Sequence, residues 1–564
     1  MNEEKLKSPA VCVALGFILL LGLYLRVAGL STLGPGFDEP IHIYAAMSIL
    51  QTGEPTLPSG FEYTRSLLFT SLVAVSFKIM GASLFAARMP SVLFSMFSIL
   101  LLFKIGSDFF GRKVGLAAAF LMAFVPFEVS WARACRMYSM YQFFYLGAFY
   151  AFYRAFESRE TPSPDAAHGG GRPFLARLVC TWGLKWNWLI VCMASFGIAF
   201  HLQHLAGVFP LSVLIYLLAM LVVTLPGKSK EQFLRSKYFV FSSAIVFAMT
   251  IALLIPQVQS QFIEHYSYTP EWNKSVGTSA TRYFNYLISP MLFPFMVFFA
   301  LGSIELLSRW NKEGFYTLVI TATPLAVHSF AVNVQGWRYV YDIFPLVLLI
   351  AGYAISSFGE KTVSLVVDSF RTIEWRSQTM RKSCIVLSMS LLFVVFSVPF
   401  LYTAHGALKL SRNQDGNYGA EYHADWEKAC RFLNGARQSG EIVVASIPIA
   451  AMYCGCDEVQ YKLDNGGMDL FRHVEGSDLS LDVYSNAMAI TSLDELKRVL
   501  SEHRYGWLLV DVQRFDNPST IPPPIRGFVE KYFTYRYKAN GTILVFSWNP
   551  DVVSQAGLLA VSAQ

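Results

Sequence analysis

Apolar runs of about twenty residues recur along the first 400 positions of this 564-residue chain. A helix of about twenty apolar residues spans the ~30 Å hydrocarbon layer of a bilayer. Open backbone cannot face lipid, and the runs are too long for the alternating strands of a barrel. Since 54% of the residues are hydrophobic and only 15% are charged, we expect a polytopic α-helical membrane protein and exclude a soluble globular chain.

The lengths of the runs predict about eleven transmembrane helices. The expected spans are 9–30, 84–105, 113–128, 137–156, 186–200, 205–225, 238–256, 286–307, 315–331, 339–358 and 384–402. The first run follows Lys5 and Lys7, as a signal peptide would, but it is about 22 residues long and lacks an Ala-x-Ala exit. It is therefore interpreted as an uncleaved span.

Charge predicts the orientation of these spans. Residues 1–402 contain 30 Lys and Arg, and 21 of them lie on the inner side if the N-terminus is cytoplasmic. Short cytoplasmic loops retain basic residues, so the assignment is self-consistent and places the C-terminus on the outer side. The membrane is expected to be a bacterial or archaeal plasma membrane. Basic charge belongs to the membrane part, because residues 403–564 have 15 basic and 19 acidic residues. Nucleic acid is therefore not expected as a partner.

The chain changes character after position 402. Helices are expected at 425–435 and 492–503, and strands at 441–447, 506–512, 532–537 and 542–548. This alternation predicts a small extracytoplasmic α/β domain, 403–564, after a transmembrane domain, 1–402, whose first outer loop is 31–83. Within that loop, 67–80 is too short to span and is expected to lie along the interface. The eight cysteines suggest no disulfide framework, and the Cys454-x-Cys456 pair is too weak to imply a metal.

The sharpest local signal is Asp38-Glu39, directly after the first span. Two adjacent carboxylates near the headgroups repel one another, so a paired cation, a metal or a catalytic task is expected. Asp38 and Glu39 are the candidate catalytic residues. A structural alternative is that Asp38 caps a helix, because Gly36 precedes it and Pro40 follows.

Other outer segments supply candidate phosphate-binding residues. Arg133 and Arg136 are three residues apart, so on a helix they would share a face and could hold one phosphate; snorkelling to headgroups is the alternative. Arg338 and Tyr341 are also three residues apart, at the outer end of the predicted span 339–358. An aromatic belt would also explain the tyrosine. The remaining candidates for substrate or phosphate binding are Arg65 and Tyr138.

A divalent metal is considered as a possible cofactor. Glu62 is placed to be a metal ligand or a hydrogen-bond acceptor, and His42 lies one helical turn after Glu39. A lone histidine is more often simply hydrogen-bonded, so no cofactor is assigned.

At these residues the chain resembles the GT-C glycosyltransferases, in particular the family of protein O-mannosyltransferases and lipid A aminoarabinose transferases (glycosyltransferase families 39 and 83). The matching features are Asp38-Glu39, Gly53-Glu54-Pro55 with Glu62, Ala86-Ala87-Arg88-Met89-Pro90-Ser91, Phe110-Gly111-Arg112-Lys113-Val114-Gly115, Arg338-Tyr339 with Pro345, and a C-terminal outer domain. The likeness is good over residues 8–360 and holds only in layout beyond them.

The resemblance implies an inverting transfer of a hexose or pentose from a polyprenyl-phosphate donor to a lipid, glycan or protein hydroxyl on the outer face. It implies that Asp38 is the general base and that Arg133, Arg136 or Arg338 stabilises the leaving phosphate. Two departures stand out. Tyr63 occupies the position of a family lysine, which shifts the phosphate role to Arg65 or the second-loop arginines and leaves the metal in doubt. The second outer loop offers only Glu128 as an acid, so a second acidic function is unassigned.

Three other functions compete with this interpretation. A transporter or flippase for polyprenyl-linked glycans would place ionisable residues at mid-membrane and interrupt spans in paired halves, whereas the charges here gather at span ends. An oligosaccharide polymerase or ligase would rely on a large late outer loop. A non-catalytic membrane subunit would be unaffected by loss of the Asp38 carboxylate.

Overall fold

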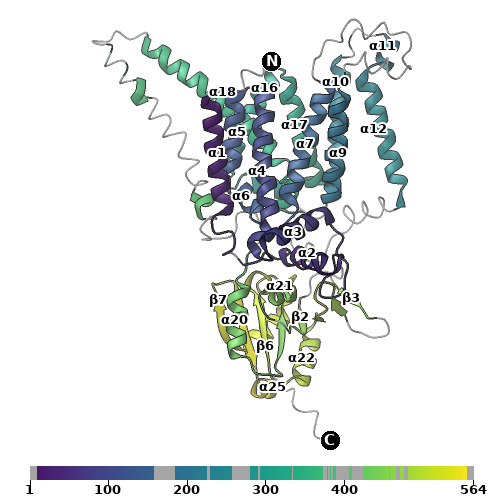
Figure 1. Ribbon diagram of the computed structural model, residues 1–564, viewed down its shortest axis with the longest axis vertical. Helices are drawn as coiled ribbons and strands as arrows, with labels where there is room; N and C mark the ends of the chain where they lie inside the picture. Colours follow the sequence, from purple (N-terminus) through teal and green to yellow (C-terminus); the bar gives the residue numbers. More distant parts are fainter. Residues whose placement is uncertain are drawn as a thin grey trace.

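The computed structural model describes residues 9–157, 184–256, 280–371 and 423–555, with gaps at 33, 225, 227–228, 290–291, 333–334, 457, 465–470 and 475–479, and also residues 378, 382, 385–388 and 405–409. Long helices stand side by side in one bundle, and a layer formed by α2 (Glu39–Thr52) and α3 (Leu67–Met80) lies between this bundle and a β-sheet (Figure 1). The helices of the bundle and of this layer are α1 (Pro9–Val27), α2 (Glu39–Thr52), α3 (Leu67–Met80), α4 (Leu84–Phe109), α5 (Arg112–Phe124), α6 (Pro126–Ala132), α7 (Tyr138–Phe156), α9 (Trp186–Leu202), η3 (His204–Gly207), α10 (Val208–Thr224), α11 (Lys230–Leu234), α12 (Lys237–Leu254), α15 (Arg282–Leu287), α16 (Phe293–Ser308), α17 (Lys312–Phe330), η4 (Trp337–Val340) and α18 (Phe344–Arg371).

Helices occur in ten of the eleven ranges that were predicted to span the membrane, and the eleventh, 384–402, lies almost wholly outside the described residues. Within the described chain, five helical segments are long and apolar enough to cross a bilayer: α1, α4, η3 with α10, α12 and α18. A sixth is added if α5 and α6 count as one span. The prediction of a multi-pass helical membrane protein is confirmed, whereas the number eleven stays a prediction.

Two predicted spans are interrupted. The helix expected at 113–128 breaks at Val125, where the axes of α5 and α6 differ by 62°. Pro126 explains the break, because proline has no backbone N–H to continue the α5 ladder but fits the first turn of a new helix. The helix expected at 286–307 begins only at Phe293, after the short helix α15.

Close packing of the bundle depends on small residues where helices meet. A Cβ on Gly106 of α4 would lie 2.8 Å from the Cα of Gly115 in α5, so the two backbones approach each other directly. Small residues allow such approach in membrane bundles, where packing rather than water exclusion holds helices together. The contact between α4 and α5 positions α6 and the segment 133–137 that follows it, which we call the second outer loop after the predicted orientation.

Helices α2 and α3 lie across one end of the bundle (Figure 1). Helix α3 has the bounds predicted for the interfacial helix, and its buried face carries Phe69, Val73 and Phe77. Helix α2 starts directly after Asp38, with Glu39 and Pro40 in its first turn. The layer therefore places the start of α2 between the bundle and the C-terminal region.

The C-terminal region contains one mixed eight-stranded sheet with the order β3-β4-β5-β2-β1-β6-β8-β7. Strand β1 is parallel to β2 and β6, and β2 is parallel to β5, whereas the other pairs are antiparallel. The strands are β1 (Ile442–Ala445), β2 (Tyr461–Leu463), β3 (Phe471–His473), β4 (Ser480–Asp482), β5 (Met488–Ile490), β6 (Gly506–Asp511), β7 (Thr534–Ala539) and β8 (Ile543–Trp548). The helices are α20 (Trp426–Ala436), α21 (Pro448–Tyr453), α22 (Leu493–Glu502), α23 (Val512–Phe515), α24 (Pro523–Tyr532) and α25 (Pro550–Gln555).

The central strands β1 and β6 are buried along their whole length, as parallel strands covered on both faces usually are. The six predicted C-terminal elements correspond to α20, β1, α22, β6, β7 and β8. The short strands β2 to β5 were not predicted, because three-residue strands carry too little periodic signal. The expected combination of a helical membrane part with a C-terminal α/β fold is confirmed.

One cysteine interpretation needs correction. The sequence suggested no disulfide framework, but Cys430 of α20 and Cys456, after α21, form a disulfide. Their separation of 26 residues gave no signal, and the nearer pair Cys454 and Cys456 drew attention instead. Cys454 is a free thiol. Disulfides persist in oxidising compartments, so this bond bears on the orientation of the chain.

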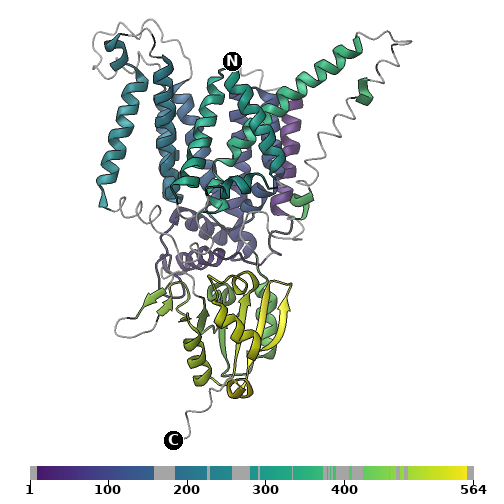
Figure 2. The same cartoon turned by 180° about the vertical axis from the view of Figure 1, so that it is seen from behind.

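The first outer loop and the C-terminal region share one hydrophobic core. Ile41, Ala45 and Tyr63 from the loop belong to the same buried cluster as Trp426 and Ile449. An isolated antiparallel bridge pairs Gly36 with His423 across the junction. The view from behind shows the same order of layers, with the sheet directly below α2 and α3 (Figure 2).

Candidate active site at the start of helix α2

The carboxylate of Asp38 meets two arginines from distant segments. Its Oδ2 lies 2.8 Å from Nη2 of Arg136 and 3.8 Å from Nη1 of Arg338. Arg136 comes from the second outer loop and Arg338 from η4, the short helix before α18. The side chain of Asp38 is 19% exposed, so the carboxylate is held by cations and is still reachable. The structure therefore brings together three of the residues singled out in the sequence.

The side chain of Asp38 does not cap helix α2, although the sequence offered capping as an alternative role. Asp38 occupies the N-cap position of α2, but its side chain makes no capping hydrogen bond. Pro40 contributes to the start of the helix through its fixed backbone angle. The carboxylate is thus turned to the arginines rather than to the first backbone amides of its helix.

Glu39 is enclosed and fully paired. It accepts hydrogen bonds from Nε and Nη2 of Arg88, at 2.9 and 2.7 Å, and from the backbone amides of Gly36 and Cys135. Burial alone would raise the pKa of Glu39, but the charge and hydrogen bonds of Arg88 outweigh it and hold that pKa below its usual range. Because its side chain is 0% exposed, Glu39 ties α2 to α4 and the second outer loop and cannot touch a substrate.

Arg136 and Arg338 form the cationic side of the site. Arg136 is almost fully buried, and its guanidinium lies 5.6 Å from the centre of the Tyr138 ring. Arg338 is 32% exposed and lies over the ring of Tyr339 at 5.0 Å. Aromatic faces steady a guanidinium without occupying its hydrogen-bond donors. Both arginines keep the fork geometry that suits a phosphate.

Arg133 is not part of this cationic pair. Its guanidinium donates to the backbone carbonyls of Leu25, Arg26, Ala28 and Gly29, which follow or form the C-terminal end of α1. A cation there offsets the helix dipole and satisfies carbonyls that lack intrahelical partners.

The expectation that Arg133 and Arg136 share a helix face is wrong, because α6 ends at Ala132 and α7 begins at Tyr138. The intervening backbone is not helical, so spacing by three residues no longer places two side chains together.

The remaining predicted binding residues fall in different surroundings. Arg65 is exposed on the first outer loop. Tyr138 is buried, packs edge-to-face on Trp131 and lies beside Arg136. Tyr341 is fully buried, and its hydroxyl lies 3.5 Å from the Ser139 hydroxyl. Of these, only Tyr138 adjoins the pair formed by Asp38 and Arg136.

The candidate metal ligands do not form a metal-binding group. Glu62 is exposed, whereas His42 is fully buried, with Nδ1 2.9 Å from the Thr70 hydroxyl. Burial, with the charges of Arg136 and Arg65, holds the pKa of His42 well below its usual range. No group of three or more His, Cys, Asp or Glu side chains in the described part of the chain could hold a metal ion. The residues present do not fit a metal centre of the usual kind.

Glu128, the only acid of the second outer loop, faces the inside of the bundle. It is fully buried in α6 and accepts from Nε2 of Gln142 at 3.1 and 3.2 Å. Arg26 lies close enough to act on its charge. Glu128 is a structural acceptor, and the second acidic function stays open at that position.

Sequence reasoning missed several buried residues that support the site. Arg26 donates to the carbonyls of Met122 and Ala123 at the end of α5, and Arg88 donates to those of Leu30 and Gly34 as well as to Glu39. Arginines in or at the ends of apolar runs are costly in a membrane and signal a partner. His423, whose Nδ1 lies 3.0 Å from the Gly34 carbonyl, gave no such signal.

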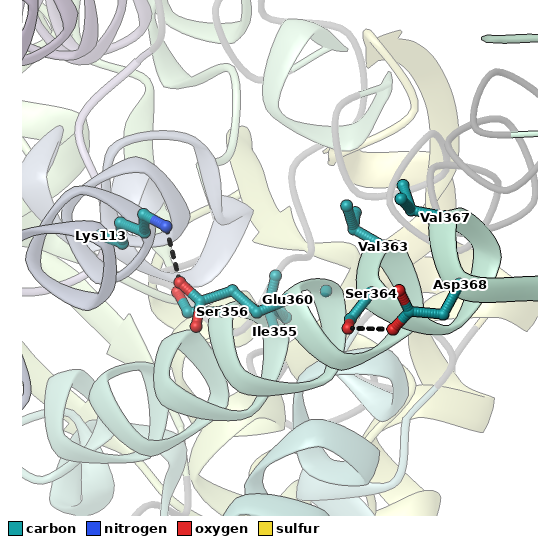
Figure 3. A pocket seen from close by; sticks show the side chains of 9 residues that line it. Lys113, Ile355, Ser356, Glu360, Val363, Ser364, Val367 and Asp368 are labelled. Atoms are coloured by element: carbon teal, nitrogen blue, oxygen red, sulfur yellow. Dashed lines mark hydrogen bonds and ion pairs between the residues drawn. The ribbon is translucent and has the colours of Figure 1, made fainter. Parts of the chain in front are cut away.

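A surface hollow lies elsewhere on the bundle. It is lined by Lys113 of α5 and by residues 355–368 of α18 (Figure 3). Its ion pair, Lys113 with Glu360 at 2.6 Å, is exposed on both sides, and exposed pairs contribute little energy. Its polar groups pair with one another, as Ser364 does with Asp368. This hollow carries no catalytic grouping.

Comparison with protein families gives a match over part of the chain. Residues 64–163 match the family model described as dolichyl-phosphate-mannose-protein mannosyltransferase. That range includes α3, α4 and the second outer loop with Arg136. A search of curated protein sequences finds no significant match. The predicted family resemblance is confirmed over this part of the chain.

Solved structures match over nearly the whole chain. ArnT from Cupriavidus metallidurans bound to undecaprenyl phosphate aligns at 9% identity, covering 94% of this chain and 97% of ArnT, with a TM-score of 0.56. The oligosaccharyltransferase AglB from Archaeoglobus fulgidus, in complex with an inhibitory peptide and a dolichol-phosphate, aligns at 11% identity, covering 95% of this chain and 74% of AglB, also with a TM-score of 0.56. At such identities the likeness establishes the fold. The chain is a multi-pass membrane protein with the GT-C glycosyltransferase fold, built like ArnT and AglB.

Proposed function

We propose that this protein is an integral-membrane glycosyltransferase that moves a hexose or pentose from a polyprenyl-phosphate donor to an acceptor hydroxyl. The carrying observation is the grouping of the Asp38 carboxylate with Arg136 and Arg338, at 2.8 and 3.8 Å, beside a membrane bundle. The matching family is named for a dolichyl-phosphate sugar donor. The structure of ArnT contains undecaprenyl phosphate and that of AglB contains a dolichol-phosphate. These ligands support a polyprenyl-phosphate carrier for this protein as well.

In this mechanism Asp38 is the general base. It takes the proton of the acceptor hydroxyl as that oxygen attacks the anomeric carbon, while the bond from that carbon to the phosphate oxygen breaks. Charge grows on the leaving prenyl phosphate, and the forks of Arg136 and Arg338 stabilise it. Attack from the side opposite the phosphate inverts the anomeric centre.

The ion pair seen here indicates how the donor engages the site. Asp38 and a phosphate would compete for the same two guanidinium groups. A phosphate that takes over the arginines releases the carboxylate, which is then free to accept the proton of the acceptor hydroxyl. Loading of the donor therefore prepares the base for the acceptor.

We place this chemistry on the extracytoplasmic side, with the N-terminus in the cytoplasm. The distribution of basic residues supports that orientation. The disulfide between Cys430 and Cys456 supports it as well, because a disulfide is stable in an oxidising compartment. The acceptor, a lipid, glycan or protein hydroxyl, then meets Asp38 from the side of the C-terminal region.

The test supplies purified protein in liposomes with polyprenyl-phosphate sugars labelled in the sugar, beginning with dolichyl-phosphate mannose. We expect the wild-type protein to release prenyl phosphate and to transfer the labelled sugar to the acceptor. Asp38→Asn should lose transfer by about 10²–10⁴-fold, the usual contribution of a general base. Glu54→Gln, an exposed acid in the same loop, is the matched control and should retain activity.

Two outcomes would contradict the proposal. Unchanged turnover in Asp38→Asn would remove the base. Movement of intact donor across the liposome membrane without cleavage would identify a flippase instead.

A further inference from the structure

We propose that Asp342, Tyr141 and Tyr145 bind a hydroxyl group of the donor sugar, and that they determine which sugar is accepted. This inference rests on the proposed function, because it assigns the sugar-binding part of the same site. It also gives the site a second acidic residue, a role that the buried Glu128 does not fill.

The three side chains form a buried polar cluster, in which the rings of Tyr145 and Tyr141 meet edge-to-face with their centres 6.0 Å apart. The Tyr141 hydroxyl donates to Oδ2 of Asp342 at 2.9 Å. Asp342 is 3% exposed, and Tyr141 and Tyr145 are each 2% exposed. Asp342 lies between η4 and α18, whereas both tyrosines belong to α7. The cluster therefore joins the segment that carries Arg338 to the helix that follows Arg136.

Two atoms of this cluster lack partners. Oδ1 of Asp342 and the hydroxyl of Tyr145 are buried and have no hydrogen-bond partner among the described residues. The backbone amides of Asp342 and Ile343 act on the Asp342 carboxylate, but neither is a hydrogen-bond partner of its Oδ1. Buried polar atoms are normally hydrogen-bonded, because an unpaired one has lost its hydrogen bonds to water without gaining others. The cluster thus offers one free acceptor and one free donor.

The position of the cluster relates it to the phosphate-binding arginines. Tyr138, Tyr141 and Tyr145 are spaced by three and four residues, so they line one face of α7. Tyr138 lies at the start of that face, beside Arg136. Asp342 follows Arg338 by four residues. The polar face therefore leads from the two arginines into the bundle, where a sugar attached to the bound phosphate could reach it.

The chemistry of the cluster suits a sugar hydroxyl. A hydroxyl donates one hydrogen bond and accepts others, so it can donate to Oδ1 of Asp342 and accept from Tyr145. Asp342 also differs from Asp38 and Glu39, because it forms no ion pair with any described residue. An acid without a cation is free to select a neutral, hydrogen-bonding group.

The experiment compares two ligands that differ only in the sugar. Binding of the intact polyprenyl-phosphate sugar and of bare polyprenyl phosphate is measured for wild type, Asp342→Asn and Tyr145→Phe. Both substitutions nearly preserve volume, and the first keeps an acceptor for Tyr141. We expect each variant to bind the intact donor about tenfold more weakly and the bare phosphate within twofold of wild type.

Tyr316→Phe is the control variant. Its hydroxyl is also buried, but it donates to the carbonyl of Phe149 in another part of the bundle. It should leave both affinities unchanged, and thermal unfolding verifies that each variant is folded.

Equal weakening of both ligands would overturn the proposal, because the cluster would then act on the phosphate or on the fold. No change with either ligand would also overturn it, since a water molecule then suffices for the two atoms. A wild type that binds neither ligand would refute the proposed function itself, and Arg136→Ala reports on that point separately, since it should weaken both ligands.

Discussion

Asp38 and Glu39 are neighbours in the chain, yet they belong to two different regions of the molecule. Glu39 lies in a sealed junction, 0% exposed, with hydrogen bonds from Arg88 and two backbone amides. Asp38 lies in an open region: its side chain is 19% exposed and pairs with Arg136 at 2.8 Å and with Arg338 at 3.8 Å. A buried carboxylate that accepts all its hydrogen bonds from the protein itself, as Glu39 does, stabilises the fold. A carboxylate that shares its cations and reaches solvent is available for chemistry.

The largest expected effect concerns the sealed region. Glu39→Gln removes the charge that Arg88 needs while leaving that guanidinium buried. Breaking a buried pair in this way costs about 3–5 kcal/mol. Thermal unfolding in detergent should show a much lower midpoint for Glu39→Gln and a smaller decrease for Asp38→Asn, because the side chain of Asp38 is 19% exposed. A stable but inactive Glu39→Gln protein would reverse the roles assigned to the two acids.

The next effect concerns the two arginines of the open region. Arg136→Gln should weaken the inhibition of transfer by bare polyprenyl phosphate about tenfold or more, because charge-assisted hydrogen bonds to a desolvated phosphate are lost. Arg338→Gln should weaken it less, since that side chain is more exposed and solvent screens it. Arg65→Gln, at an exposed position, is the matched comparison and should change inhibition by less than twofold. A dominant effect of Arg65 would shift the phosphate site toward the first outer loop.

The smallest effect concerns acidification of the sealed junction. Burial, together with the charge of Arg88, lowers the pKa of His423 to about 4. The folded state therefore favours the neutral imidazole, and this contribution is fully present above about pH 6.5 and is lost as the pH falls toward 4. At pH 5.5 the loss is about 1 kcal/mol. His423→Gln should flatten the decline of the unfolding midpoint between pH 7 and pH 5, and an unchanged slope would show that His423 is not its source.

Much of the architecture was predictable because it depends on local pattern. The lengths of the apolar runs predicted most of the helices, and the alternation after position 402 predicted β1 and β6. Pro126 was visible in the sequence, but its consequence was not, because a proline in an apolar run can kink a helix or end it. The end of α6 then separated Arg133 from Arg136, which a helical spacing had placed together.

The candidate site was predictable only in part, for a related reason. Asp38, Arg136 and Arg338 stood out as charges at span ends, and they do meet. The distinction between Asp38 and Glu39 depends on Arg88 in another helix and on His423 in the C-terminal region. Such partners are chosen by tertiary packing, which no spacing within the chain reveals. Asp342 escaped notice because its significance lies in an unfilled hydrogen-bonding position.

The hydrophobic core shared by the first outer loop and the C-terminal region limits how the chain can be divided. Ile41 and Tyr63 depend for their burial on the side of the molecule that contains Trp426. A chain shortened to its first 402 residues would expose the apolar surface around Ile41 and Tyr63 to water, close to Asp38 in the sequence. Neither half is expected to behave as an independent unit, and swapping C-terminal regions between relatives would require the loop to be exchanged with them.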